Sequence, residues 1–139
     1  AAHFDVDAPG QLVLDVGTGS GLLAMMAVQA GARAAVSCEV LEPVAHVARR
    51  IISANALSEH IHILSKSSLD LSVGRDLPAR ADLLVTETID CGLLGEGILP
   101  IVDHAREPLL RAAARGHRAC PLGQVRARRQ ALSPPCGCA

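Results

Sequence analysis

The chain has 139 residues, which is enough for at most one domain. Half of its residues are hydrophobic but its only aromatic residue is a single Phe, so the core has to be built from Leu, Val, Ile and Ala. The net charge of −1 excludes a strong overall positive field of the kind that attracts nucleic acid.

Apolar runs and helical patterns alternate along the chain. Runs rich in strand-forming residues lie at residues 11–16, 34–40, 61–64 and 81–85. Helical patterns follow three of them, over residues 22–30, from Pro43 onward and over residues 98–114. This order predicts an α/β fold, in which right-handed crossovers give a parallel sheet with helices on both faces. Doubly wound domains normally have more than four strands, so the sheet is expected to be incomplete.

A glycine-rich loop follows the first strand. It reads Asp15-Val16-Gly17-Thr18-Gly19-Ser20-Gly21, and its alternate glycines let the chain turn tightly and let a ligand approach the backbone. The loop opens a helix whose free N–H groups favour polar or anionic groups. Glu39 ends the next strand, 22 residues after Gly17, where a carboxylate can accept both hydroxyls of a ribose. These features predict a nucleoside-binding site, with a generic glycine turn as the alternative.

The spacing of the glycines distinguishes between nucleoside cofactors. The dinucleotide motif is G-x-G-x-x-G, whereas this loop is G-x-G-x-G, with Leu22 where the dinucleotide motif needs glycine. An acid followed by G-x-G-x-G resembles the first motif of the S-adenosylmethionine-dependent methyltransferases, and NAD is the alternative ligand. The resemblance implies that the third strand ends beside the adenine, where Ser68 is a candidate to hydrogen-bond the ring. A polar turn without ligand contacts is the alternative interpretation there.

A second glycine-rich loop, TETIDCGLLGEG at residues 86–97, follows the fourth strand. Glu87 and Glu96 are nine residues apart, with Asp90 between them. Crowded carboxylates raise one another's pKa, so they stay ionised best around a cation. A metal ion is a weak candidate because His104 is the only histidine near this loop. A guanidinium fits better, because it is planar, always charged and forms paired hydrogen bonds with carboxylates; a solvated acidic loop is the alternative.

The spacing of the two glutamates resembles the double-glutamate loop of the protein arginine methyltransferases. The form E-T-x-D-x-G-L-x-G-E-G is most similar to arginine methyltransferase 9 and next to arginine methyltransferase 7, and the resemblance covers roughly residues 12–110. It implies an enzyme that transfers a methyl group from S-adenosylmethionine to a guanidino nitrogen of a protein arginine, without a metal. Glu87 and Glu96 would hold the guanidinium. The residues that would bind the cofactor are Asp15, Gly17, Gly19, Gly21, Glu39 and Ser68.

The resemblance leaves the product and the activity open. Type 9 implies monomethyl and symmetric dimethyl arginine, and type 7 implies monomethyl arginine only. Two alternative functions are a fragment that binds the cofactor without catalysis and a methyltransferase that acts on a small molecule.

Parts of the family pattern are missing from this sequence. The family places helices with an Arg before the first motif, but no Arg or Lys precedes Arg33. The family also has a β-barrel with a Thr-His-Trp loop, and the chain contains no Trp. We therefore expect a truncated protein, in which residues 1–117 form a partial Rossmann-like domain. Residues 118–139 are a candidate start of the barrel that runs into a disordered basic tail.

The cysteines and the hydropathy pattern bear on location. Five cysteines, an odd number without a C-x-x-C pair, indicate free thiols in a reducing compartment. The N-terminal residues do not have the pattern of a signal peptide, and no run of about 18 apolar residues predicts a membrane span. We expect a cytoplasmic or nuclear protein with no direct nucleic-acid contact and no membrane contact. The sequence does not indicate an oligomeric state.

Overall fold

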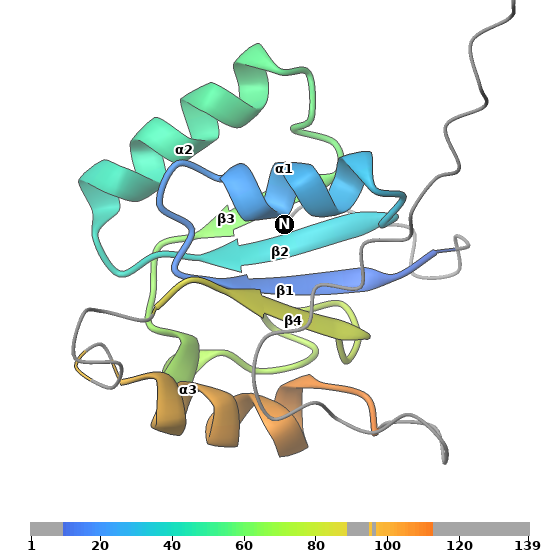
Figure 1. The fold of residues 1–139 in the computed structure, drawn as a ribbon, viewed down its shortest axis with the longest axis vertical. Helices are drawn as coiled ribbons and strands as arrows, with labels where there is room; N and C mark the ends of the chain where they lie inside the picture. Colours follow the sequence, from blue (N-terminus) through green and yellow to red (C-terminus); the bar gives the residue numbers. More distant parts are fainter. Residues whose placement is uncertain (1–9, 89–94, 96, 113–139) are drawn as a thin grey trace, which may run out of the picture.

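The structure, a computed structural model, describes residues 10–88, 95 and 97–112. Within these residues one sheet has four parallel strands in the order β3-β2-β1-β4 (Figure 1). The strands are β1 Leu12–Val16, β2 Ala34–Cys38, β3 Ile61–Leu64 and β4 Leu83–Thr86. This is the order of the first four strands in a doubly wound sheet.

Helices cover both faces of the sheet (Figure 1). The helices α1, Leu22–Gln29, and α2, Glu42–Ala54, lie on one face, because the chain passes from β1 to β2 to β3 in one direction. The helix α3, Ile98–His104, lies on the other face and continues into a π-helical segment, Ala105–Leu109. After β3 the chain returns to the other side of β1 to add β4, so the order in which strands are added reverses between β1 and β4. This doubly wound sheet therefore has its switch point at the carboxyl ends of these two strands.

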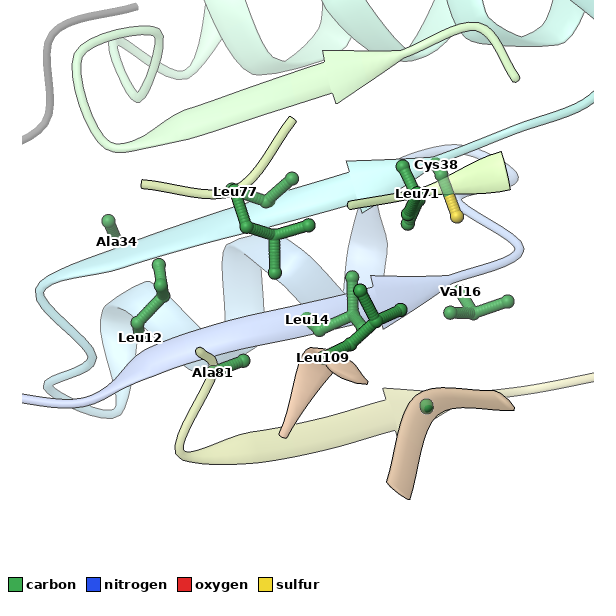
Figure 2. Close-up of a cluster of buried hydrophobic side chains, with 11 residues drawn as sticks. Leu12, Leu14, Val16, Ala34, Cys38, Leu71, Leu77, Ala81 and Leu109 are labelled. Carbon is green, nitrogen blue, oxygen red and sulfur yellow. The ribbon is translucent and has the colours of Figure 1, made fainter. Parts of the chain in front are cut away.

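The central strand β1 contributes side chains to two hydrophobic clusters. Leu12, Leu14 and Val16 pack with Leu109 on the face of α3 (Figure 2). Val13 packs on the opposite face against a cluster supplied partly by α1 and α2. Every residue of β1 and β2 is buried, which explains why these strands are continuous apolar runs without alternation.

The predicted α/β class, the parallel sheet and the helices on both faces are confirmed. Three predicted boundaries are wrong by more than a residue, one of them at the end of the described chain. The helix expected over residues 98–114 ends its regular part at His104, and Leu110 is extended. Pro108 has no N–H to bond back to the helix, so the α-helical ladder cannot continue through it.

The two remaining differences concern strands. The fourth strand begins at Leu83 rather than at residue 81, because Ala81 bonds instead to Leu109 and Arg111. The second strand ends at Cys38 rather than at residue 40. There the Glu39 carboxylate accepts a hydrogen bond from the Leu41 N–H at 3.0 Å, which turns the chain toward α2. In the part of the chain that the structure describes, no helix is long and apolar enough to cross a bilayer.

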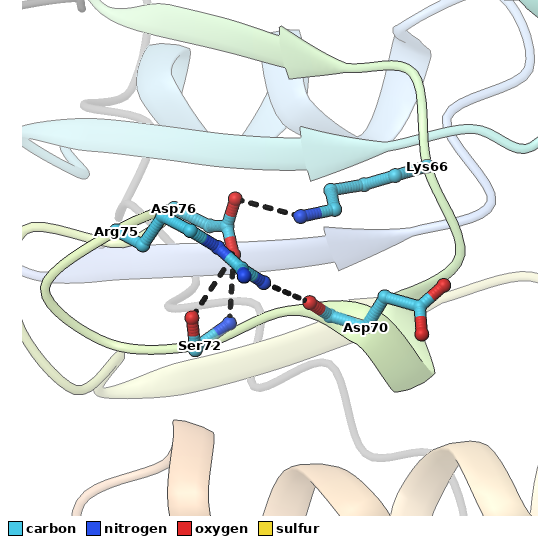
Figure 3. Close-up of polar contacts among 5 residues, drawn as sticks. All are labelled: Lys66, Asp70, Ser72, Arg75 and Asp76. Carbon is cyan, nitrogen blue, oxygen red and sulfur yellow. Dashed lines mark hydrogen bonds and ion pairs between the residues drawn. The ribbon is translucent and has the colours of Figure 1, made fainter.

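A charged network fixes the loop after β3 (Figure 3). The carboxylate of Asp76, whose side chain is only 8% exposed, contacts Lys66 Nζ at 2.9 Å and Arg75 Nε at 3.0 Å. It also accepts a hydrogen bond from the N–H of Ser72 at 2.9 Å. Arg75 in turn donates to the carbonyl oxygen of Asp70 at 2.6 Å. The network therefore holds the short 3₁₀ turn Ser68–Asp70 in place.

The network changes the ionisation of its central acid. Burial acts to raise the pKa of Asp76, but the hydrogen bonds from Lys66, Ser72 and Arg75 outweigh it and lower the pKa to about 2. A lowered pKa means that the ionised form stabilises the native state. This contribution is present above pH 4, and is lost as the pH falls from about 4 to about 2.

We predict that Asp76→Asn lowers the free energy of unfolding at pH 7, because Lys66 and Arg75 lose their partner. The deficit relative to the unsubstituted chain should shrink as the pH approaches 2. Urea unfolding between pH 2 and pH 7 measures it. Asp70→Asn is the matched control, since it removes the same charge from an exposed position in the same loop; an equal effect of both variants would contradict the role of the network.

Candidate active site

The glycine loop connects β1 to α1 at the switch point. The Cys38 carbonyl accepts hydrogen bonds from the N–H groups of Gly17 and Thr18, at 3.0 and 3.1 Å. Gly19 has a positive φ of 52°, and no atom lies within 4 Å of the position that a Cβ would take. The loop is therefore anchored at one end to β2 and leaves open space at Gly19, where a ligand can approach the backbone.

The third glycine of the loop has a packing role. Gly21 has a φ of 84° and precedes the first residue of α1. A Cβ there would lie 3.1 Å from Cδ1 of Ile52, so the glycine allows α1 and α2 to approach closely. The glycine loop thus also packs against α2.

Glu39 connects the glycine loop to the turn before α2. One carboxylate oxygen accepts from the N–H of Gly19 at 3.2 Å, and the other accepts from the N–H of Leu41 at 3.0 Å. A carboxylate oxygen has two lone pairs. Each oxygen therefore keeps acceptor capacity for a ligand hydroxyl in addition to these contacts.

Asp15 is fully buried beneath the loop. Its Oδ2 accepts a hydrogen bond from Ser37 Oγ at 2.7 Å, and Ser37 Oγ lies 2.5 Å from Thr18 Oγ1. Burial raises the pKa of Asp15 to about 6; the Ser37 hydrogen bond lowers it and the nearby Glu39 charge raises it. Ser37 is not among the site residues predicted from the sequence, although it is a serine inside an otherwise apolar strand run.

The end of β4 lies directly against the glycine loop. Thr86 donates to the Val16 carbonyl at 2.8 Å, and its oxygen lies 3.1 Å from the Thr88 hydroxyl. Thr88 is buried, and its Cγ2 lies 2.9 Å from the position of a Cβ on Gly17. Glu87 is exposed, and its carbonyl oxygen is 3.9 Å from the same position. The structure therefore brings the backbone of Glu87 close to Gly17 of the loop.

The structure describes only some of the other predicted site residues. Glu96 and Asp90 lie outside the described residues. Ser68 is 7% exposed, whereas its neighbour Leu69 is 47% exposed, so Leu69 presents more surface to a ligand than Ser68 does. Among residues 10–88, 95 and 97–112, no group of three His, Cys, Asp or Glu side chains is arranged to hold a metal ion. Cys38 is a free, buried thiol whose pKa burial raises to about 12, which keeps it from acting as a nucleophile.

Comparison with known proteins agrees with this arrangement. The family model described as ribosomal protein L11 methyltransferase (PrmA) matches residues 4–106. Protein arginine N-methyltransferase 7 of Rattus norvegicus is 46% identical over 131 residues, which are 90% of this chain and 19% of that protein. The chain belongs to the PrmA family of methyltransferases and is a homologue of the protein arginine N-methyltransferases.

Two further relatives each match 73% of the chain. Arginine N(omega)-methyltransferase of Streptomyces achromogenes subsp. streptozoticus is 51% identical over 102 residues, 73% of this chain and 28% of that protein. The Trypanosoma brucei PRMT1 enzyme-prozyme heterotetrameric complex with AdoHcy is 32% identical, with a TM-score of 0.65 over 73% of this chain and 30% of that one. The chain thus spans less than a third of each of these relatives. The methyltransferase fold predicted from the glycine loop is confirmed.

We predict that Gly17→Ala destabilises the chain more than Gly31→Ala does. Both glycines have positive φ, 81° and 102°, so each alanine would incur backbone strain of about 1–2 kcal/mol. Only at Gly17 does the new Cβ also meet Thr88, because Gly31 has open space around it. Thermal and urea unfolding of both variants measure the difference.

The added variant Thr88→Ser separates the two causes. It removes Cγ2, so the Gly17→Ala, Thr88→Ser double variant should lose only about as much stability as Gly31→Ala, after subtraction of the Thr88→Ser effect. If Gly17→Ala and Gly31→Ala are equally destabilising, Thr88 does not press on the loop.

The raised pKa of Asp15 predicts a pH dependence of stability opposite to that caused by the lowered pKa of Asp76. Its native pKa of about 6 lies above the ordinary 3.8, so the native state binds the proton more tightly than the unfolded state does. The stabilisation is complete below about pH 4 and is lost as the pH rises through 6. Relative to Asp15→Asn, the unsubstituted chain should lose up to about 3 kcal/mol between pH 4 and pH 7. Urea unfolding of both proteins across this range tests it, and parallel curves would contradict it.

Proposed function

We propose that the whole protein transfers a methyl group from S-adenosylmethionine to a guanidino nitrogen of arginine. The observation that carries this proposal is the position of Glu87, which directly follows β4 and whose backbone carbonyl lies 3.9 Å from the position of a Cβ on Gly17 of the glycine loop. Glu87 is also the first glutamate of the pair nine residues apart that resembles the double-glutamate loop. An acid that binds a guanidinium at this place would lie next to the cofactor.

The residues of the first loop fit S-adenosylmethionine. Gly19 leaves room above the backbone, and Glu39 has acceptor capacity for the ribose hydroxyls. Asp15 has a buried oxygen, Oδ1, without a hydrogen-bond partner, which suits a cationic ligand. Leu69, exposed beside Ser68, offers an apolar surface for the adenine. A solved relative with 32% identity holds AdoHcy, the demethylated form of this cofactor.

When bound, S-adenosylmethionine supplies an activated methyl group on a sulfonium. The chain would supply orientation and charge. Glu87 would hold one edge of the guanidinium by charge-assisted hydrogen bonds, and Glu96 the other. This grip would draw positive charge toward the bound edges and leave the remaining nitrogen richer in electrons. One of the two carboxylates would then accept the proton that the nitrogen loses. Fixing the nitrogen in line with the methyl group would be the larger contribution, of order several kcal/mol.

The subtype belongs to this proposal as well. The loop resembles that of type 9, whereas a type 7 enzyme, that of Rattus norvegicus, is 46% identical to the chain. We propose a type 7-like product, monomethyl arginine, with symmetric dimethyl arginine as the product if the type 9 resemblance holds. We also propose arginine-containing proteins as substrates and a cytoplasmic or nuclear location.

A second substrate is favoured by one comparison. A relative that is 51% identical is named for arginine and not for protein arginine. Free L-arginine carries the same guanidinium, so the glutamates cannot distinguish it from a peptide arginine. The family model is named for ribosomal protein L11, so a protein acceptor other than arginine is a further alternative.

We predict that the chain binds S-adenosylhomocysteine in calorimetric titration and transfers labelled methyl to an arginine acceptor. The acceptors are an arginine-rich peptide, the same peptide with lysine in place of arginine, and L-arginine. Glu87→Gln and Glu96→Gln should each lower transfer by about 100-fold, because each removes a charge that positions the nucleophile. Their affinity for S-adenosylhomocysteine should stay within about threefold.

Glu59→Gln is the control, since Glu59 is exposed and far along the chain from both loops. Methylation of the lysine peptide would overturn the arginine assignment, and methylation of L-arginine alone would favour the small-molecule substrate. Binding without transfer to any acceptor would support a chain that holds the cofactor but has no activity of its own. No binding would remove the proposal.

A further inference from the structure

Three buried side chains are joined beneath the glycine loop. Ser37 Oγ on β2 lies 2.7 Å from Asp15 Oδ2 on β1 and 2.5 Å from Thr18 Oγ1 in the loop. Asp15 and Ser37 have no exposed surface, and Thr18 is 5% exposed. Asp15 and Ser37 are register partners in the sheet, which places both side chains on the face of α1 and α2. Ser37 is the member that contacts both of the others.

The number of protons fixes the direction of these hydrogen bonds. A serine hydroxyl has one proton, and Ser37 donates it to Asp15. Thr18 must then donate its own proton to Ser37. When Asp15 is ionised, the order is Thr18 to Ser37 to Asp15. When Asp15 is protonated, its proton can be donated to Ser37, the order reverses, and the Thr18 proton is released toward the loop surroundings.

Among the described residues, no positively charged side chain on the elements around Asp15 compensates its charge. The helix α1 carries no ionisable side chain, and α2 faces this cluster with Ala45, Ala48 and Ile52. On the sheet, Val85 of β4 is apolar, and the thiol of Cys38 is neutral at physiological pH. Glu39 is the charged group whose field reaches Asp15, and it has the same sign. A buried carboxylate with an unpartnered oxygen and a like charge nearby is stabilised by a bound cation.

We propose that Ser37 is a positioning residue of the cofactor site, which holds Asp15 and Thr18 together and so couples the ionisation of Asp15 to binding of a cationic ligand at the glycine loop. The inference rests on the proposed function, because S-adenosylmethionine would be that ligand. Ser37 does not need to touch the cofactor. It acts through the carboxylate that it orients and through the loop hydroxyl that it holds.

The coupling has a measurable consequence. The pKa of Asp15, about 6, lies within reach of ordinary binding experiments. Below this pH, Asp15 loses its negative charge and the hydrogen bond of the loop hydroxyl reverses. Affinity for a positively charged ligand should then fall roughly tenfold for each unit of pH, as one proton competes with the ligand. A neutral analogue that lacks the sulfonium charge should show no such fall.

The first experiment observes Asp15 itself, without any ligand. The carboxyl carbon of Asp15 is titrated by NMR in the unsubstituted chain, in Ser37→Ala and in Ser37→Thr. Ser37→Ala removes the hydrogen bond that lowers the pKa of Asp15, so the midpoint should rise by about one unit. Ser37→Thr keeps the hydroxyl, so the Asp15 midpoint should return to that of the unsubstituted chain. Ser53→Ala, at an exposed position on α2, is the control and should leave the midpoint unchanged.

The second experiment measures binding of S-adenosylmethionine and of 5′-methylthioadenosine by calorimetry between pH 5 and pH 8. Affinity for S-adenosylmethionine should fall at low pH, with a midpoint that Ser37→Ala moves upward and Ser37→Thr returns. Affinity for methylthioadenosine should stay flat. Circular dichroism confirms that each variant is folded at each pH.

The outcomes separate this inference from the proposed function. An unchanged Asp15 midpoint in Ser37→Ala overturns the inference whether or not any ligand binds. If Ser37→Ala loses affinity for S-adenosylmethionine equally at every pH, Ser37 has a merely structural role, and this result also overturns the inference. If the unsubstituted chain binds neither ligand, the proposed function fails. In that case, a shifted Asp15 midpoint would show only that Ser37 sets the pKa of Asp15, and the proposed coupling to a ligand would be wrong.

Discussion

The hydrogen bond from the Thr86 hydroxyl to the Val16 carbonyl is the contact on which the site depends. It joins the carboxyl ends of β1 and β4, the two strands between which the chain changes direction. Because Thr86 donates its single proton to Val16, the Thr88 hydroxyl has to donate to Thr86. This fixes Thr88 against Gly17 and carries Glu87 to the glycine loop. Two segments about 70 residues apart in the sequence therefore form one site.

Two aspartates show how the surroundings decide the behaviour of the same side chain. Asp76 is contacted by a lysine, an arginine and a backbone N–H, and its pKa falls to about 2. Asp15 receives one hydroxyl and faces a second carboxylate, and its pKa rises to about 6. The first acid stabilises a loop, and the second destabilises the native state at neutral pH. A residue that costs stability without a ligand is expected where a ligand provides the missing charge.

Homology and geometry contribute different parts of the functional argument. The homology to protein arginine N-methyltransferases covers the glycine loop, the end of β2 and the end of β4, within a chain that spans less than a third of the relatives compared. The geometry explains why these segments act together, since all three lie at the carboxyl ends of neighbouring parallel strands. It also adds Ser37, which neither the motif nor the comparisons identify.

The sequence by itself determined the alternation of strands and helices, the parallel sheet and the two loops, because hydrophobic runs and glycine spacing are local properties. It also identified Glu39 and Glu87 as acids that follow strands. Only the tertiary structure decided that Thr88 presses on Gly17, that Ser37 joins Asp15 to Thr18, and that β4 begins at Leu83. These depend on contacts between residues 19 to 71 positions apart, and on competition between partners for the same backbone groups. Such contacts leave no periodic pattern in the sequence, so they follow only from the packed chain.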